Sequence, residues 1–237
     1  MIRSLFDTQT GAFSTQGLVQ ILMLIPIILI SLTLHELAHG YAAYKCGDNT
    51  AKAFGRLTLN PISHLDPLGA LMIFIVGFGW AKPVPINMRN FRKPRRDLFI
   101  VSIAGVVVNF LLAFIGVFIM FGSTYLTFLP ENTISTIINF FFLFSFINIS
   151  LGLFNLIPLP PLDGSKIVAS ILPPIAAAKY LRLEFYSRYI FLGIIIISWL
   201  PGPFGLLSDI IWGPFGFLRN GILSLFHQFA NLIFRVY

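Results

Sequence analysis

The sequence predicts an all-α, multi-pass membrane protein with about five to six membrane segments and a short β-hairpin or re-entrant element near the cytoplasmic face. Of its 237 residues, 57% are hydrophobic and only 11% are charged, which is not the composition of a soluble domain. Three uncharged apolar runs can cross a hydrocarbon core of about 30 Å as helices. These runs are Leu18–Leu34, Leu98–Gly122 and Ile134–Ile157.

The remaining apolar runs are shorter or interrupted. The run Leu68–Trp80 is too short for an easy crossing, so we expect a re-entrant or tilted element there. Tyr189–Leu200 is expected to cross, while later proline-glycine breaks leave the path of residues 201–237 open. We therefore expect an extracytoplasmic N-terminal segment (1–17), a core (18–172) and C-terminal membrane segments (173–237), with the first span retained and not cleaved as a signal.

The basic residues indicate how the chain is oriented. Thirteen of the 16 Lys and Arg residues lie either between the first two spans or between the third span and Tyr189, whereas the only charged residue in 123–133 is Glu131. The positive-inside rule then places the basic segments in the cytoplasm of a multi-pass cell-membrane protein and the N-terminus outside. Because the basic residues sit at span ends, we expect no nucleic-acid partner, although the net charge is +7.

The first span ends in His35-Glu36-Leu37-Ala38-His39, an HExxH motif. A helix puts residues i and i+4 on one face, so both imidazoles can bind one metal ion. Glu36, one position further round the helix, is not a ligand but lies close enough to take a proton from an attacking water. Counted from Leu18 at about 1.5 Å per residue, His35 lies roughly 25 Å along the helix, inside the membrane near its cytoplasmic edge.

A catalytic zinc ion usually has three protein ligands, so a third is expected elsewhere. The unplaced candidates are His64, Asp66, Asp163, Asp209 and His227. Asp163 follows three prolines that must break the third span, and a break at membrane depth needs a polar cavity such as a metal site. The alternative for Asp163 is a plain proline turn that ends in Asp-Gly.

These motifs resemble the site-2 protease family of intramembrane metalloproteases over about residues 18–172. The resemblance is carried by His35–His39, by Ala104-Gly105 with Asn109, and by Asn155–Gly164. It implies one zinc ion per chain held by His35, His39 and Asp163, catalysis by Glu36, and a hold by Asn155 on the substrate backbone or oxyanion. It also implies cleavage of peptide bonds in or near the transmembrane segments of single-span membrane proteins, near the cytoplasmic face.

One departure from the family pattern and one feature of length accompany that resemblance. Val106 stands where members often have proline, which puts the local helix shape in doubt. The chain also has no room for the PDZ or CBS domains of some members, so we expect the compact type.

Other polar residues leave alternatives open. Residues 57–67 are expected to form a turn-rich loop or hairpin in which His64 either faces the substrate or is satisfied locally. Residues 82–91 either receive substrate as an added strand or form a plain connector. Asn109 and Asn148 are expected to bond neighbouring helices, and residues 221–234 to form an interfacial helix.

Two rival functions fit the same motifs less well. A zinc transporter or sensor would need polar residues across the full membrane depth, whereas here they gather near one end. A catalytically silent binding protein would have no use for Glu36 as a base. The single cysteine, Cys46, is given no role.

Overall fold

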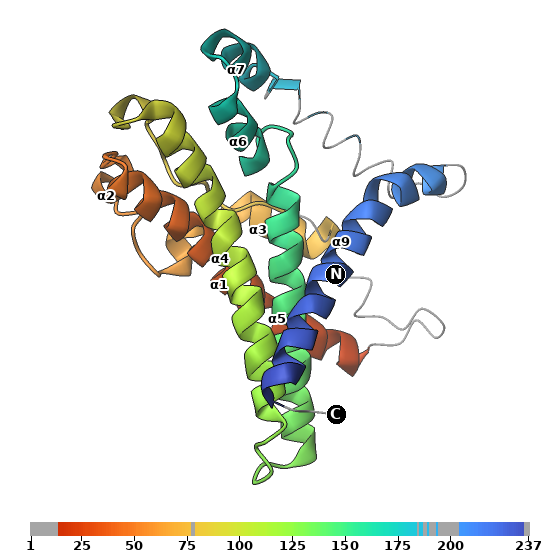
Figure 1. The fold of residues 1–237 in the computed structure, drawn as a ribbon. Helices are drawn as coiled ribbons and strands as arrows, with labels where there is room; N and C mark the ends of the chain where they lie inside the picture. Colours follow the sequence, from red (N-terminus) through yellow and green to blue (C-terminus); the bar gives the residue numbers. More distant parts are fainter. Residues whose placement is uncertain are drawn as a thin grey trace. The chain divides into compact units, whose positions relative to one another are not determined.

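The computed structural model describes residues 14–76, 79–183, 185, 186, 189, 193 and 204–234, and they form helices joined by loops (Figure 1). The chain divides into two compact units, residues 1–92 and 93–237. Within the described part, three helices are long and apolar enough to cross a membrane: α1 (Thr15–Lys45), α4 (Pro94–Ser123) and α5 (Glu131–Asn155). The three predicted spans are confirmed as such helices. Most of the expected Tyr189–Leu200 crossing lies outside the described residues.

The first unit is built on α1. The Ser14 side chain caps this helix by accepting a hydrogen bond of 3.1 Å from the Gly17 N–H, and the helix then runs through Pro26 to Lys45. Gly47 follows with a φ of 108°, a conformation that favours glycine and turns the chain away from the helix. The short helices after it are α2 (Thr50–Ala53), η2 (Pro61–His64), α3 (Pro67–Val76) and η3 (Met88–Asn90).

The expected hairpin in residues 57–67 is not confirmed. This segment contains the 3-10 turn η2, which Pro61 begins and the Asn60 side chain caps through a hydrogen bond of 3.1 Å from the Ile62 N–H. Pro61 has no N–H to give to a strand partner. Leu65 and Ala81 form an isolated antiparallel bridge, and the described residues contain no strand. α3 has ten residues, which agrees with an element too short to span.

The second unit centres on α4 and α5, which lie side by side (Figure 1). A Cβ on Gly116 would lie 2.4 Å from the Ser145 Oγ, so glycine allows the close approach of these helices. Nδ2 of Asn109 donates a hydrogen bond of 2.9 Å to Oδ1 of Asn148. The prediction that these asparagines bond neighbouring helices is confirmed.

The third long helix of this unit, α9 (Phe204–Phe234), packs against α4 and α5. Its Leu223 and Ala230 are buried in a core with Ala113, Val117 and Ile149. One side of α9 is therefore covered by the α4–α5 pair, and the interfacial position of residues 221–234 stays a prediction.

α5 ends at Asn155, before the prolines at 158, 160 and 161, so the predicted break in this helix is confirmed. The chain then forms tight turns and enters α6 (Asp163–Ile171) and α7 (Pro174–Leu181). A Cβ on Gly164 would lie 2.3 Å from the Leu156 carbonyl oxygen. Glycine after Asp163 thus lets the start of α6 pack against the end of α5.

Candidate metal centre

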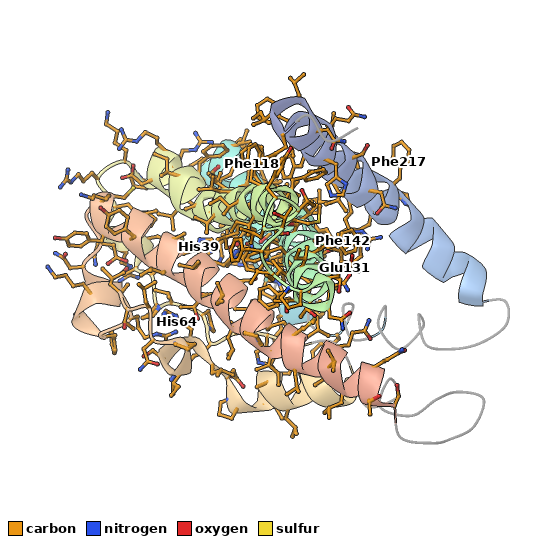
Figure 2. All side chains as sticks on the ribbon, turned by 90° about the horizontal axis from the view of Figure 1, so that it is seen from below. His39, His64, Phe118, Glu131, Phe142 and Phe217 are labelled. Carbon is orange, nitrogen blue, oxygen red and sulfur yellow. The ribbon has the colours of Figure 1, made fainter. Side chains whose placement is uncertain are left out.

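His35 and His39 lie one helical turn apart on α1, and both are buried. Their Nε2 atoms are 3.0 Å apart, and the ring planes meet at 81° (Figure 2 labels His39). Zinc–nitrogen bonds of about 2.0–2.1 Å in a tetrahedral site would put two such atoms roughly 3.3 Å apart. Two imidazole nitrogens that converge in this way fit the donor set of a zinc ion.

Glu36 is held by a residue far along the chain. Its Oε2 accepts a hydrogen bond of 2.9 Å from the backbone N–H of Val84. Val84 is itself buried and belongs to the segment of residues 80–87, which we call the connector because it joins the end of α3 to η3. The carboxylate next to the two histidines is therefore oriented by a backbone donor.

The connector reaches α1 because a glycine leaves room for it. A Cβ on Gly40 would lie 2.8 Å from Leu57 Cδ2 and 3.1 Å from Val84 Cγ1. Gly40 is one turn beyond Glu36, so Val84 can pack on the helix surface beside that carboxylate. The Arg56 guanidinium donates a hydrogen bond of 2.7 Å to the Lys82 carbonyl, and the Lys82 N–H donates one of 2.9 Å to the His64 carbonyl.

The far end of the connector is anchored by Asp48, whose side chain is fully buried. Its carboxylate accepts hydrogen bonds from the Asn87 N–H at 2.7 Å, from Asn90 Nδ2 at 2.8 Å, and from the N–H and hydroxyl of Thr50. Burial by itself would raise the pKa of Asp48, but the hydrogen bonds from Thr50, Asn87 and Asn90 outweigh it and the pKa lies below its usual value. Asp48 is thus an ionised anchor for the chain that holds Val84.

His64 is 2% exposed and lies in η2. Its Nε2 donates a hydrogen bond of 2.9 Å to the Thr58 carbonyl oxygen, because a carbonyl can only accept. Nδ1 is buried and has no hydrogen-bond partner among the described residues. The alternative in which His64 is satisfied locally is thus met at Nε2, while a contact of His64 with substrate stays a prediction.

Two other candidates for the third metal ligand, Asp66 and His227, make contacts within their own part of the fold. The Asp66 carboxylate accepts hydrogen bonds of 2.9 Å from the N–H groups of Leu68 and Gly69, so it caps the start of α3. The ring of His227 lies edge-on to Phe121 on α4 at 5.6 Å. Asp209, on α9, lies among residues whose side chains are outside the described part.

Asp163 and Asn155 belong to the second unit, on either side of the proline-rich turns. Asp163 is the first residue of α6, it is buried, and its Oδ1 lies 3.4 Å from Lys166 Nζ. Asn155 is the last residue of α5, and its Nδ2 donates a hydrogen bond of 3.0 Å to the Leu151 carbonyl. The substrate-binding role of Asn155 stays a prediction.

Sequence reasoning missed Asp48 and the role of the Val84 backbone. Asp48 follows Gly47, and an Asp after a turn glycine is usually a solvated loop residue, so nothing local indicated burial. The Pro83-Val84-Pro85 run did contain a signal. Prolines on both sides leave Val84 as the one N–H donor of the three residues.

Comparisons with known proteins agree with the motifs. The model of peptidase family M50 matches residues 23–134 and 125–199. The chain is 45% identical over 208 residues to "Putative zinc metalloprotease YwhC" of Bacillus subtilis, a match that covers 86% of this chain and 90% of that protein. It is 32% identical over 193 residues to the Rip2 protein of Mycobacterium tuberculosis, which bears the same description, with 77% and 71% covered. No solved structure matches the chain.

Proposed function

Because the chain belongs to peptidase family M50, the site-2 protease family, we propose that it is a zinc metalloprotease of the membrane. Its substrates would be single-span membrane proteins, cleaved within or near their transmembrane segments. The observation that carries this proposal is the arrangement on α1, where two converging imidazoles flank a carboxylate held by the Val84 N–H. A base kept beside a metal site is needed for hydrolysis and has no use in a purely structural site.

Three residues would hold the metal, one zinc ion per chain. His35 and His39 supply two nitrogens, and Asp163 would supply the third ligand. Asp163 is supported by its buried place at the start of α6, directly after the broken end of α5, and by the family match that spans both motifs. When bound, zinc acts as a Lewis acid on the scissile carbonyl and makes water more acidic.

Glu36 would act as the general base. The hydrogen bond from Val84 occupies Oε2, so the other carboxylate oxygen, Oε1, would take the proton of the attacking water and pass it to the leaving amine. A substrate helix shields its own peptide bonds and must unwind locally before attack. Asn155 would brace the unwound chain or the developing oxyanion, and His64 would contact the substrate from η2.

The rival proposal of a zinc transporter or sensor is not favoured. Its main difficulty is Glu36, because metal transport makes no demand for a proton acceptor that is held next to the ligands without being one. The described relatives also bear the name of metalloproteases.

The orientation of the site follows from charge. Three helices of the described part suit membrane crossing, and we propose a multi-pass chain whose basic segments, such as Arg89–Arg96, face the cytoplasm. His35 and His39 lie at the end of α1 that leads into these basic segments, which would put the active site near the cytoplasmic face.

The proposal is tested with a tagged single-span substrate, co-expressed with wild type or with Glu36→Gln, and with zinc content measured on the same preparations. We expect Glu36→Gln to keep its zinc and to lose the shortened fragment by about 10²- to 10⁴-fold. A variant that keeps its zinc and still forms the fragment at the wild-type rate would disprove the role of Glu36 and the mechanism with it.

A further inference from the structure

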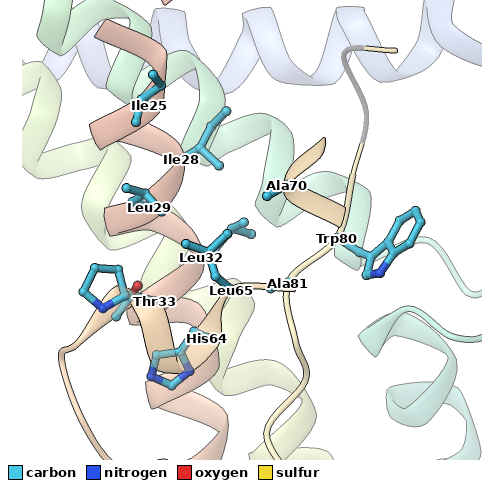
Figure 3. A pocket seen from close by; sticks show the side chains of 11 residues that line it. Ile25, Ile28, Leu29, Leu32, Thr33, His64, Leu65, Ala70, Trp80 and Ala81 are labelled. Carbon is cyan, nitrogen blue, oxygen red and sulfur yellow. The ribbon is translucent and has the colours of Figure 1, made fainter. Parts of the chain in front are cut away.

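The first unit contains an apolar cavity of about 220 Å³, between α1 and the residues that lead into and out of α3 (Figure 3). One wall comes from α1 and includes Leu29, Leu32 and Thr33, and the opposite wall includes His64, Ala70 and Trp80. Almost all of the lining is carbon. An engineered apolar cavity of about 150 Å³ binds benzene, so this cavity has room for an aromatic ring or a branched aliphatic side chain.

The cavity lies in register with the proposed general base. Leu29 and Leu32 precede Glu36 by seven and four residues, and such spacings fall on one helix face. The α1 wall of the cavity therefore leads along the helix to Glu36. On the other side, Trp80 and Ala81 line the cavity, and three residues further the Val84 N–H bonds the Glu36 carboxylate. Each wall thus continues along the chain to one partner of the hydrogen bond between Val84 and Glu36.

The neighbouring chemistry indicates what kind of molecule enters. Leu32, in the cavity wall, lies one helical turn before Glu36, so a peptide bond presented to that carboxylate would carry an adjacent side chain into the cavity. The lining is almost all carbon, so an apolar side chain is favoured over a polar one.

We infer that this cavity receives the side chain of a large apolar substrate residue, of leucine to phenylalanine size, next to the scissile peptide bond. The inference rests on the proposed proteolysis and adds a specificity-determining pocket to it. Side-chain size at one substrate position would then set the rate of cleavage. Leucine or phenylalanine there would fill the cavity, while alanine would leave it empty.

The test uses a cleaved single-span substrate in which each residue around the mapped cleavage site is changed in turn to Ala, Leu or Phe. For wild type we expect one position at which Leu or Phe raises kcat/KM over Ala by about tenfold or more. Ala70→Leu narrows the cavity and should abolish that preference while the Ala substrate is still cleaved. Trp80→Ala removes a ring that is 43% exposed, widens the cavity and should favour Phe over Leu.

The matched control is Ala53→Leu, an equal enlargement at an exposed residue of α2, which should keep the wild-type preference. Cleavage that needs Glu36 but ignores side-chain size at every position would overturn the pocket alone. The pocket would also be overturned if Ala70→Leu and Trp80→Ala left the preference unchanged. A change only in the copurifying lipid would then mean that the cavity holds lipid. Cleavage that Glu36→Gln does not affect would instead overturn the proposed function, and this inference with it.

Discussion

The backbone N–H of Val84 donates a hydrogen bond of 2.9 Å to Oε2 of Glu36, across 48 positions of sequence. This bond ties the HExxH helix to the connector that also lines the apolar cavity. Because the donor is a backbone N–H, most substitutions of Val84 would leave this hydrogen bond in place. The donor is instead removed by proline, because proline has no N–H.

Val84→Pro should therefore lower proteolysis while zinc stays bound. Residues before a proline favour extended backbone, and Val84 already precedes Pro85, so the substitution suits the local conformation. A hydrogen bond to a charged group is worth about 1.5–3 kcal/mol, so kcat/KM should fall by roughly 10- to 100-fold. The measurement is cleavage of the single-span substrate together with zinc content.

Val84→Ala is the control, because it keeps the N–H and removes only the packing against Gly40. It should retain clearly more activity than Val84→Pro. Equal losses in the two variants would mean that the Val84 side chain, and not its N–H, supports Glu36.

Asp48→Asn should destabilise the first unit in a pH-dependent way. The pKa of Asp48 lies below its usual value of 3.8, so the ionised carboxylate stabilises the fold at every pH above that value. This contribution is lost as the pH falls below 3.8 through the lower pKa of the folded state. At pH 7 an amide would set a donor against the donors of Asn87 and Asn90, at a cost of about 1–3 kcal/mol.

Thermal unfolding in detergent at pH 7 and near pH 3 measures this effect. The difference in unfolding free energy between wild type and Asp48→Asn should shrink at the lower pH. A difference that is the same at both values would show that the charge of Asp48 does not contribute. Proteolysis at pH 7 should also fall, because Asn87 and Asn90 no longer fix the connector.

Much of the site was predictable because its chemistry is local. The HExxH spacing specifies a helix face, and three prolines within four residues cannot continue a helix, so the motif on α1 and the end of α5 followed from the sequence. Asn109 and Asn148 were likewise predictable, because an amide inside an apolar helix needs a partner on another helix.

The unpredicted features depend on contacts between distant segments. No local pattern indicates that Asp48 is buried and accepts four hydrogen bonds. Nor does one indicate that Leu223 and Ala230 of α9 pack onto α4 and α5. The hairpin expected as one alternative for residues 57–67 is not confirmed, since Pro61 begins and Asn60 caps a 3-10 turn there. Apolar residues in a membrane protein suit lipid and protein neighbours equally, so hydropathy could not show that α9 packs onto α4 and α5.

The proposed orientation predicts which residues reagents reach from each side. Arg92 and Asn132 are both exposed; Arg92 precedes α4, and Asn132 follows it in the first turn of α5. In a Cys46→Ser background, Arg92→Cys should react with a membrane-impermeant thiol reagent only after the cytoplasmic side is opened, and Asn132→Cys in intact cells. The reverse labelling would invert the chain and place the active site at the outer face.

The last prediction concerns the third metal ligand, for which the chain provides its own control. Purified wild type should contain about one zinc ion per chain. Asp163→Ala should lower the zinc content well below that of wild type, because two imidazoles alone make an incomplete site.

Asp66→Ala is the control. It removes a carboxylate that caps α3 through the Leu68 and Gly69 N–H groups, so it should cost about 1 kcal/mol of stability and leave the zinc in place. Elemental analysis after gel filtration in detergent compares the three proteins at equal chain concentration. Zinc retained in Asp163→Ala and lost in Asp66→Ala would mean that the ligand comes from the first unit, and that the Asp-Gly after the prolines is only a helix start.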